Sequence, residues 1–454
     1  AGRLEQLWDY EKYSLPKKAA GRYFYDYNDG LQNQDSIYFQ ETLESEPQLL
    51  IDPNSWSEDD TMALAGFYPS PDGRFLAYTT QDGGSDWRTA RIMDLEERTT
   101  LADELEWLKF TMPVAWAADS SGFYYSRYPE PGEGAKHQES SLNHRVFFHR
   151  PGTPQNEDEL IYERPDHPDW SYIPYVTENG RYLILVVFKQ GSKQQVVVLD
   201  LERSGAEPDL LIEGFDYSWG PLGSTDSEIL FLTNHSAPNY RIVAIDPADS
   251  AEDQWRQIVA EGDDVITDAS LVGGHLIAEY LQDARFMGRV FDLTGTEQRT
   301  ISIPGIGSAH GFEGRADDPE TFYSFSSFNA PPTIYRYNAE TGEGTIFKQA
   351  QVAFEPEDYV VEQVFFESRD GTRVPMFIAH RRDLPRDGDR PALLYGYGGF
   401  NVSMKPRFSV PTLAWLEMGG VYALANLRGG GEYGEAWHQA GTKLDKQNVF
   451  DDFI

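Results

Sequence analysis

The sequence predicts a seven-bladed β-propeller over residues 10–352, followed by the first part of an α/β domain over residues 353–454. Three observations predict this architecture: a repeat of about fifty residues, seven copies of its anchor, and a change after residue 352 to alternating strand-like and helix-like segments. Residues 1–9 contain Leu4, Leu7 and Trp8 at helical spacing. We expect them to form a helical stub that belongs to the α/β domain.

Each repeat is anchored by a turn residue, one variable residue and two apolar or aromatic residues that open a strand. The anchors begin at Gly21, Gly73, Gly122, Gly180, Ser227, Gly274 and Glu320. Subtracting successive positions gives spacings of 52, 49, 58, 47, 47 and 46 residues. Short β-rich units at this period are typical of four-stranded propeller blades. A generic β-sandwich array is the alternative, but it does not require one period over seven units.

The pattern changes near residues 354–358. Two strand-like runs, 359–366 and 373–379, flank an Arg-Asp-Gly-Thr turn and predict a β-hairpin. Then follow a short strand, a helix, an apolar strand and a helical approach, at 391–395, 411–418, 420–427 and 437–454. This order is the beginning of an α/β sheet with crossover connections. Since a parallel sheet needs more strands and two covered faces, we expect the domain to be incomplete and the chain to be cut at both ends.

Composition lowers the expectation of several functions. The chain has 38 basic and 74 acidic residues, a formal charge of −36. This surface repels phosphate backbones and anionic lipids, so we expect no nucleic-acid or membrane partner. Two explanations of the acidity stay open, simple solubility and a salt-tolerant source. No apolar run approaches the ~18 residues of a membrane helix, and no signal peptide opens the chain, although Ala1-Gly2-Arg3-Leu4 is not typical of a natural start.

Cysteine and metal chemistry are also disfavoured. The chain has no cysteine, which excludes disulfides, thiol catalysis and thiolate metal sites. No His-Glu-x-x-His motif is present. We therefore expect neither a metal nor a cofactor.

A glycine-rich loop follows the strand at 391–395. In Tyr395-Gly396-Tyr397-Gly398-Gly399-Phe400 the backbone is unusually bare, so a ligand can approach closely. A tyrosine hydroxyl held there could donate a hydrogen bond to a developing oxyanion. An ordinary structural loop with stacked aromatic rings is the alternative. Phosphate binding is disfavoured, because no Lys-Ser/Thr pair follows the glycines.

A second glycine-rich loop, 428–434, follows the next strand and begins with Arg428. It could position an acid or bind an anion, or it could be a sharp structural loop. His438 nearby is expected to be structural. No Gly-x-Ser-x-Gly nucleophile motif occurs in the chain. A hydrolase function therefore requires a nucleophile beyond Ile454.

These motifs together resemble the prolyl oligopeptidases, a family of serine peptidases. The resemblance rests on segments 394–400, 425–434, 437–438 and 446–453, and upstream on 30–34, 84–87 and 237–241. The related trypsin-like oligopeptidases share the Arg-Gly-Gly-Gly-Glu element but usually differ at 397–400 and at Tyr433. Cleavage after proline is therefore the better match.

The resemblance implies a seven-bladed propeller that caps an α/β-hydrolase domain, with the active site between them. Tyr397 resembles the hydroxyl donor of the oxyanion hole. Phe400 and Phe110 resemble apolar walls of the substrate subsites, and Asp86 resembles an acid that pairs at the domain junction. The family's substrate-binding arginine has no clean match here. Its catalytic Ser, Asp and His all lie later in the sequence, so we expect this chain alone to be inactive.

The partners implied are short proline-containing peptides and the missing C-terminal hydrolase segment, in a protein that is cytoplasmic and, like much of the family, monomeric when complete. A periplasmic or secreted location stays open. The competing hypothesis is a non-catalytic peptide-binding propeller that carries a vestigial hydrolase segment. The Tyr-Gly-Tyr-Gly-Gly-Phe loop favours the enzyme, since a binding propeller has no use for it.

Overall fold

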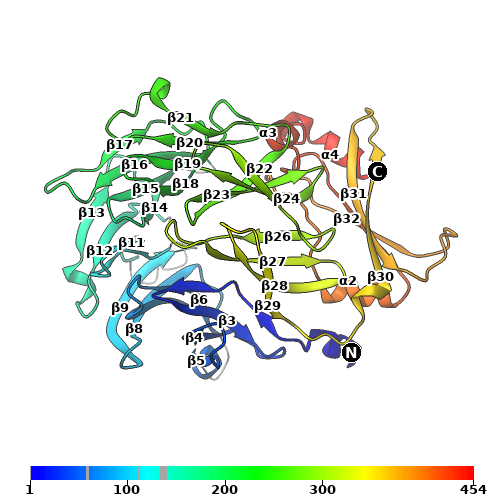
Figure 1. The fold of residues 1–454 in the computed structure, drawn as a ribbon, viewed down its shortest axis with the longest axis horizontal. Coiled ribbons are helices and arrows are strands. Elements are labelled where there is room, and N and C mark those ends of the chain that lie inside the picture. The colour runs from blue at the N-terminus through cyan, green and yellow to red at the C-terminus, as the bar shows by residue number, and fades with distance from the viewer. Residues whose placement is uncertain (1, 58–60, 110–112, 133–140, 190, 192) are drawn as a thin grey trace.

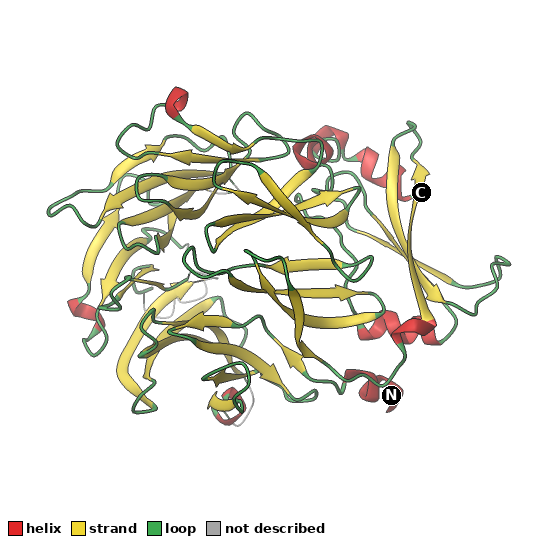
Figure 2. Ribbon diagram, viewed as in Figure 1, coloured by secondary structure: helices red, strands yellow, loops and turns green. Residues whose placement is uncertain are grey.

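The computed structural model describes residues 2–57, 61–109, 113–132, 141–189, 191 and 193–454. Strands are the main regular secondary structure of the molecule, and the α-helices gather on the side where both chain ends lie (Figures 1 and 2). None of the helices in the described part of the chain has the length and hydrophobicity to span a bilayer.

The described residues between 12 and 349 form seven antiparallel sheets, each built from consecutive strands, so the predicted seven-bladed propeller is confirmed (Figure 1). Blade 1 comprises β1 (Lys12–Tyr13), β2 (Lys17–Ala19), β3 (Arg22–Asn28), β4 (Ser36–Gln40) and β5 (Gln48–Ile51). Blade 2 comprises β6 (Met62–Pro69), β7 (Phe75–Asp82), β8 (Trp87–Asp94) and β9 (Thr99–Lys109). Blade 3 comprises β10 (Ala115–Trp116), β11 (Phe123–Arg127), β12 (Arg145–His149) and β13 (Glu159–Glu163).

The remaining blades each have four strands. Blade 4 comprises β14 (Trp170–Val176), β15 (Tyr182–Lys189), β16 (Gln194–Asp200) and β17 (Asp209–Ile212). Blade 5 comprises β18 (Trp219–Ser224), β19 (Ile229–Thr233), β20 (Arg241–Ile245) and β21 (Arg256–Val259). Blade 6 comprises β22 (Val265–Val272), β23 (His275–Gln282), β24 (Arg285–Asp292) and β25 (Glu297–Ile301). Blade 7 comprises β26 (Ser308–Gly311), β27 (Glu320–Ser327), β28 (Ala330–Asn338) and β29 (Gly344–Gln349).

Blade 1 departs from the four strands expected, because its first strand is split. β1 and β2 both pair with β3, at its two ends. Pro16 lies between them and has no N–H for a ladder hydrogen bond, which explains the interruption.

The sequence anchors mark the turn before the second strand of each blade, and two of them show why glycine recurs there. Gly73 and Gly180 have φ values of +69° and +74°, which favour glycine. A Cβ on Gly73 would lie 2.8 Å from the Cβ of Ala20, and one on Gly180 would lie 2.9 Å from the Cβ of Ala118. Both alanines belong to the preceding blade, so the glycines also allow close packing of neighbouring blades.

The propeller core lies between blades. Among the described residues, six of the seven seams hold apolar clusters of nine to twelve buried residues. The seam between blades 7 and 1 holds three: Tyr23, Phe322 and Ile334. There Glu320 accepts hydrogen bonds from Lys18 at 2.6 Å, from the hydroxyl of Tyr23 at 2.7 Å and from Arg336 at 2.5 Å. At the seam between blades 7 and 1, ion pairs and hydrogen bonds therefore take the place of a large apolar cluster.

The α/β segment, defined here as residues 353–454, contains a four-stranded mixed sheet of order β30-β31-β33-β32. Its elements are β30 (Tyr359–Glu367), β31 (Arg373–Arg381), β32 (Ala392–Gly396), α2 (Val410–Glu417), β33 (Val421–Ala425), α3 (Gly434–Gln439) and α4 (Gln447–Phe453). β30 and β31 form the predicted hairpin, and β32 runs parallel to β33 through the α2 crossover.

Short 3₁₀ turns lie at Pro53–Ser55, Gln155–Glu157, Glu252–Gln254, Pro356–Asp358 and Lys443–Asp445.

The N-terminal helix α1 (Gly2–Trp8) packs on the α/β segment, as Figure 1 shows. Leu7 is buried in the same apolar cluster as Leu413 and Leu416 of α2. Arg3 pairs with Glu417 at 2.5 Å. Helix α1 is therefore held on α2 by both apolar contact and an ion pair.

Candidate active site

Two glycine-rich loops leave the sheet at the carboxyl ends of the parallel strands β32 and β33. Loop 397–409 follows β32, and loop 426–433 follows β33. A cavity of about 290 Å³ lies between these loops and blades 5 and 6, lined by Asn401, Ser403, Lys405, Tyr240 and Thr267 among others. The carboxyl ends of parallel strands are where α/β sheets bind ligands. The loops are therefore the best candidate site in the described part of the chain.

Tyr397 lies at the start of the first loop and is 46% exposed, and Phe400 is 85% exposed. Their ring centroids are 6.4 Å apart. The backbone beneath is held closely: Lys446 donates to the carbonyl of Gly398 at 2.6 Å, and a Cβ on Gly398 would collide with Val449. Phe400 has φ of +54°, a strained value for a non-glycine residue. Both aromatic side chains thus project from a fixed backbone and stay accessible, as an oxyanion donor and a subsite wall require.

Arg428 lies in the second loop, and its role is structural. Its guanidinium binds Asp452 of α4 at 2.6 Å and Asp370 of the β30–β31 turn at 2.6 Å. Hydrogen bonds to these carboxylates outweigh burial and raise the pKa of Arg428. Arg428 and Asp452 are both buried. The loop therefore ties the sheet to its last helix.

His438 of α3 is also structural, as expected. Its Nδ1 lies 2.7 Å from the carbonyl of Gly429 and 3.0 Å from the amide nitrogen of Asn401. One ring nitrogen cannot donate and accept at once in the neutral form. Since Asn401 N–H also donates to the Gly429 carbonyl at 3.1 Å, we assign the proton to Nδ1. Both loops therefore meet at the Gly429 carbonyl.

Glu432 belongs to the second loop, and its side chain is 1% exposed. Its Oε1 accepts from the backbone N–H of Met404 at 2.8 Å and from Nδ2 of Asn426 at 3.1 Å. Burial raises the pKa of Glu432 to about 7, against the opposing effect of these hydrogen bonds. Glu432 was not among the residues predicted from the sequence to form the site. One sequence feature could have pointed to Glu432: it follows three glycines in a loop that comes after a buried strand.

The α/β segment contacts blades 5, 6 and 7, and we call this side of the propeller its near face. Asp283, in the turn between β23 and β24, accepts a hydrogen bond from the hydroxyl of Tyr433 at 2.8 Å. Ala284 beside it and Phe328 of blade 7 are buried in the apolar cluster of the segment. Asp283 is thus an interdomain acid that the sequence analysis missed.

Of the two remaining predicted residues, Asp86 and Phe110, the structure describes only Asp86. Asp86 is exposed in the turn between β7 and β8, the turn that corresponds to the Asp283 turn of blade 6. It therefore lies on the near face, and its pairing role stays a prediction. Phe110 lies outside the described residues, so its role as a subsite wall also stays a prediction. Within the described ranges, no group of three or more His, Asp or Glu side chains is arranged to hold a metal ion.

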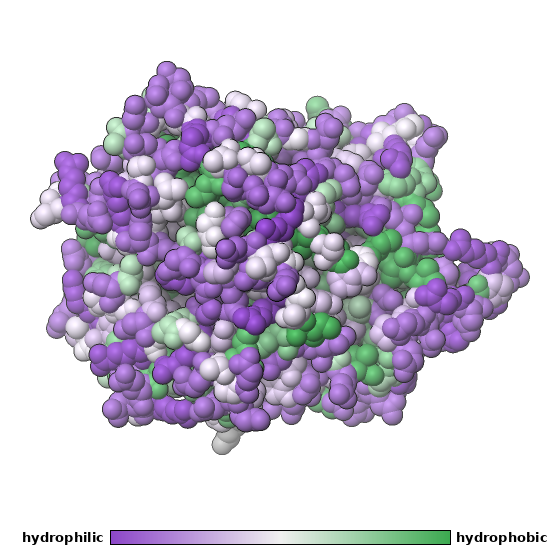
Figure 3. Space-filling model, in the orientation of Figure 1, coloured by the Kyte–Doolittle hydropathy of each residue, from purple (hydrophilic) through white to green (hydrophobic). Residues whose placement is uncertain are grey.

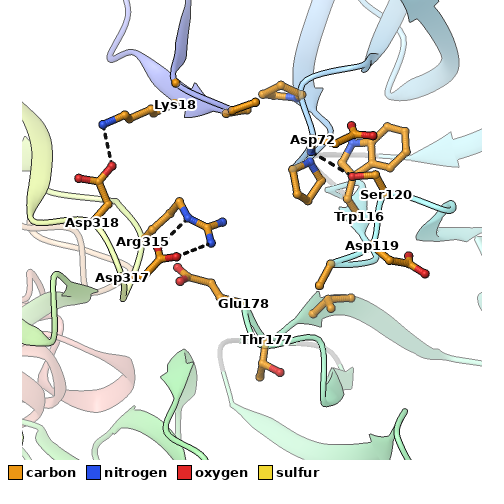
Figure 4. A pocket seen from close by; sticks show the side chains of 17 residues that line it. Lys18, Asp72, Trp116, Asp119, Ser120, Thr177, Glu178, Arg315, Asp317 and Asp318 are labelled. Carbon is orange, nitrogen blue, oxygen red and sulfur yellow. Dashed lines mark hydrogen bonds and ion pairs between the residues drawn. The ribbon is translucent and has the colours of Figure 1, made fainter.

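A larger cavity of about 720 Å³ lies at the opposite mouth of the propeller channel (Figure 4). It is lined by the turns after the first strands of blades 1, 2, 3, 4 and 7. Many of its charged groups have partners: Lys18 binds Asp318, Arg315 binds Asp317, and Glu178 accepts from the backbone N–H of Ala316 at 2.7 Å. It is remote from both glycine-rich loops, because successive turns of an antiparallel blade lie at opposite ends.

Comparison with known proteins decides the family. The family description "Prolyl oligopeptidase, N-terminal beta-propeller domain" matches residues 1–350, and "Prolyl oligopeptidase family" matches residues 406–454. The chain belongs to the prolyl oligopeptidase family. The resemblance noted in the sequence is thereby confirmed, and residues 406–454 match the start of the family's peptidase domain, the α/β-hydrolase of the predicted fold.

Two curated relatives in the family are similar over the whole chain. The prolyl endopeptidase of Elizabethkingia miricola is 39% identical, and that of Elizabethkingia meningoseptica is 38% identical. Each match covers 100% of this chain and 63% of the relative. The chain therefore spans less than two thirds of the length of these relatives.

Solved structures agree with this assignment. A prolyl endopeptidase studied for inter-domain dynamics in catalysis and specificity is 36% identical, with a TM-score of 0.91. Prolyl oligopeptidase B from Galerina marginata, bound to a 35mer hydrolysis and macrocyclization substrate, is 30% identical, with a TM-score of 0.92. Both matches cover 100% of this chain and 66% of the other.

Proposed function

We propose that the complete protein is a serine endopeptidase that cleaves short peptides after proline through an acyl-enzyme, while the propeller restricts access. The observation that carries this proposal is the exposed Tyr397 on a fixed, glycine-rich loop at the carboxyl end of a parallel strand, in a chain of this family. Preorganised donors at such a position stabilise the negative charge that develops on a scissile carbonyl.

In this proposal Tyr397 donates to the oxyanion, Phe400 and Phe110 form apolar walls for the substrate, and Asp86 pairs across the domain junction. The Ser, Asp and His of the triad come from the hydrolase segment that lies later in the family's sequences. This chain alone has no Gly-x-Ser-x-Gly motif, so we expect it to be inactive by itself. We further propose that the complete protein is cytoplasmic and monomeric.

In this proposal, the further hydrolase segment of the complete protein packs on an exposed surface of this chain. Leu393, Leu394 and Tyr395 of β32 are all 41–48% exposed, and β32 is an edge strand. Figure 3 shows apolar surface over this part of the molecule. A further parallel strand and its helix would cover these side chains and complete the sheet.

The test is a chromogenic peptide with proline before the scissile bond, assayed on a protein that carries the whole hydrolase domain. We expect Tyr397→Phe to lower kcat about 100-fold, since one oxyanion donor contributes ~3 kcal/mol to the barrier, with KM little changed. Tyr395→Phe is the matched control, because it removes the same hydroxyl two residues earlier, from strand β32 and not from the glycine-rich loop. Unchanged turnover in Tyr397→Phe would remove this residue from the mechanism. Peptide binding without any turnover would favour the non-catalytic propeller instead.

A further inference from the structure

The backbone of Met404 is held at both of its polar groups by two side chains from the other glycine-rich loop. Its N–H donates to Oε1 of Glu432 at 2.8 Å, and its carbonyl accepts from Nδ2 of Asn426 at 2.6 Å. Asn426 also donates to Oε1 of Glu432 at 3.1 Å, which closes the set. We call these three residues the Met404 clamp. It joins the loop after β33 to the loop that carries Tyr397.

The clamp matters because loop 397–409 has no regular structure of its own. Its first part is fixed by Lys446 on the Gly398 carbonyl and by Asn401 on the Gly429 carbonyl. Its last part is fixed on blade 7, where Ser308 donates to the Pro406 carbonyl at 2.9 Å. Met404 lies between these points. Loss of the clamp would therefore free the middle of the loop, four residues after Phe400.

Two buried acceptor atoms of the Met404 clamp have no donor when Glu432 is ionised. Oε2 of Glu432 and Oδ1 of Asn426 are buried and have no hydrogen-bond partner among the described residues. Both atoms are acceptors when Glu432 is ionised, so each would bear the cost of desolvation without a hydrogen bond. A proton on Glu432 removes the buried charge and gives this group of acceptors a donor.

The nearby charged groups do not supply a counter-ion to Glu432. Arg428 binds Asp452 and Asp370. Lys405, next to Met404, interacts with Glu279 and Asp268 of blade 6.

The remaining titratable neighbours are engaged as well. The hydroxyl of Tyr433 donates to Asp283, and Nδ1 of His438 donates to Gly429. The indole N–H of Trp437, which also lies near the carboxyl, donates to the Leu427 carbonyl at 3.1 Å. An ionised Glu432 would therefore be a buried charge without a partner cation in the described part of the chain.

We propose that Glu432 is a positioning residue that fixes the Tyr397-bearing loop through the Met404 backbone, and that it does so as a neutral carboxylic acid. Burial supports this assignment, since it raises the pKa of Glu432 to about 7. The catalytic consequence rests on the proposed function, whereas the clamp itself does not. When Glu432 ionises, its hydrogen bonds to Met404 and Asn426 gain strength, but the cost of the buried, unpaired charge is larger. Opening of the loop hydrates the carboxylate, so the clamp opens more often and Tyr397 loses its fixed position.

Hydrogen exchange of the segment around Met404 tests the clamp on this chain without any assay of activity. The variants are Glu432→Gln, a neutral isostere that keeps the acceptor for Met404, and Glu432→Ala, which removes it. At pH 4.5, near the ordinary pKa of a glutamic acid, we expect wild type and Glu432→Gln to protect the Met404 amide nearly equally, because a raised pKa destabilises the clamp only above that value. At pH 8.5 we expect wild type to exchange at least about tenfold faster than Glu432→Gln, because most of its carboxyl is then ionised.

Comparing the variants at one pH cancels the intrinsic pH dependence of exchange. Equal protection of wild type and Glu432→Gln at both pH values would overturn the neutral-acid assignment. Protection of Met404 in a folded Glu432→Ala variant would overturn the clamp. If Glu432→Ala does not fold, the pair of wild type and Glu432→Gln still decides the assignment.

The catalytic consequence is tested on a protein that carries the whole hydrolase domain, with the proline peptide as substrate. We expect kcat of the wild type to fall above about pH 7 and the fall to disappear in Glu432→Gln, with KM nearly the same in both. An identical high-pH limb in Glu432→Gln would overturn the link to Tyr397. Absence of any cleavage would count against the proposed function alone, because the exchange experiment judges the clamp separately.

Discussion

The propeller and the α/β segment use similar apolar strands but cover them to different degrees. In β15 of blade 4 six consecutive residues are buried, because neighbouring blades lie against both faces. In β32 of the segment four of five residues are exposed. The propeller therefore draws its stability from contacts between its own blades. The segment draws part of its stability from outside its sheet, through blades 6 and 7 and α1.

Arg428→Ala gives the largest expected effect and should separate the two regions. It leaves Asp452 buried without a counter-ion, which typically costs about 3–5 kcal/mol. We expect the segment to unfold at lower denaturant while the β-sheet circular dichroism of the propeller persists. Arg386→Ala is the control, because the exposed Arg386–Glu362 pair should contribute about 1 kcal/mol or less. A single common transition in Arg428→Ala would show that the two regions unfold as one unit.

His149→Gln tests the propeller in the same way. His149 is fully buried between blades 2 and 3, with Nε2 at 2.9 Å from Asp103 and Nδ1 at 2.7 Å from Asp158. Burial acts to lower the pKa of His149, but the two aspartates outweigh it and raise the pKa.

The stabilisation by the imidazolium is therefore complete below about pH 6.5 and is lost as the pH rises through the raised value. We expect His149→Gln to cost about 3 kcal/mol at pH 6 and clearly less at pH 9, measured by urea unfolding. The partly exposed His167→Gln is the control, because the Asp166 beside its imidazole is exposed. A cost that does not change with pH would mean that His149 is neutral in the folded protein.

Glu320→Gln tests the seam between blades 7 and 1, where charge replaces apolar contact. Burial acts to raise the pKa of Glu320, but Lys18, Tyr23 and Arg336 outweigh it and lower the pKa. Its contribution is thus present above about pH 4.5 and is lost as the pH falls through the lowered value. We expect a loss of about 2 kcal/mol at pH 7 by thermal unfolding. The exposed Glu340→Gln in the same blade should have almost no effect.

Leu393→Ala gives the smallest expected effect and addresses the exposed face of β32. In this chain we expect a change within about 0.5 kcal/mol, because Leu393 is already 48% exposed. In a protein whose further hydrolase elements cover this face, the same substitution should cost about 2–5 kcal/mol. Unfolding of both proteins in urea measures the difference. Equal effects would show that nothing packs on Leu393.

Much of the candidate site could be predicted as a pattern, but its internal partners could not. The two glycine-rich loops and the strands before them are local features, and Tyr397 and Phe400 lie on the first loop as expected. The two carboxylate partners of Arg428 could not be predicted, because Asp370 and Asp452 lie 58 and 24 residues away from it in the sequence. Asp283 lies 150 residues from Tyr433. A comparison of corresponding turns between blades would have drawn attention to it.

The sequence by itself determined the number of blades, the hairpin predicted at residues 359–379 and the crossover that places two glycine-rich loops at one end of the sheet. These features follow from short-range periodicity and turn chemistry, which each blade or unit expresses independently of the rest. Tertiary structure alone decided that Glu432 lies buried beside Met404, that His149 is enclosed by two aspartates, and that charge closes the ring at Glu320. These environments depend on which side chains exclude water from one another, and that is fixed only when distant segments pack together.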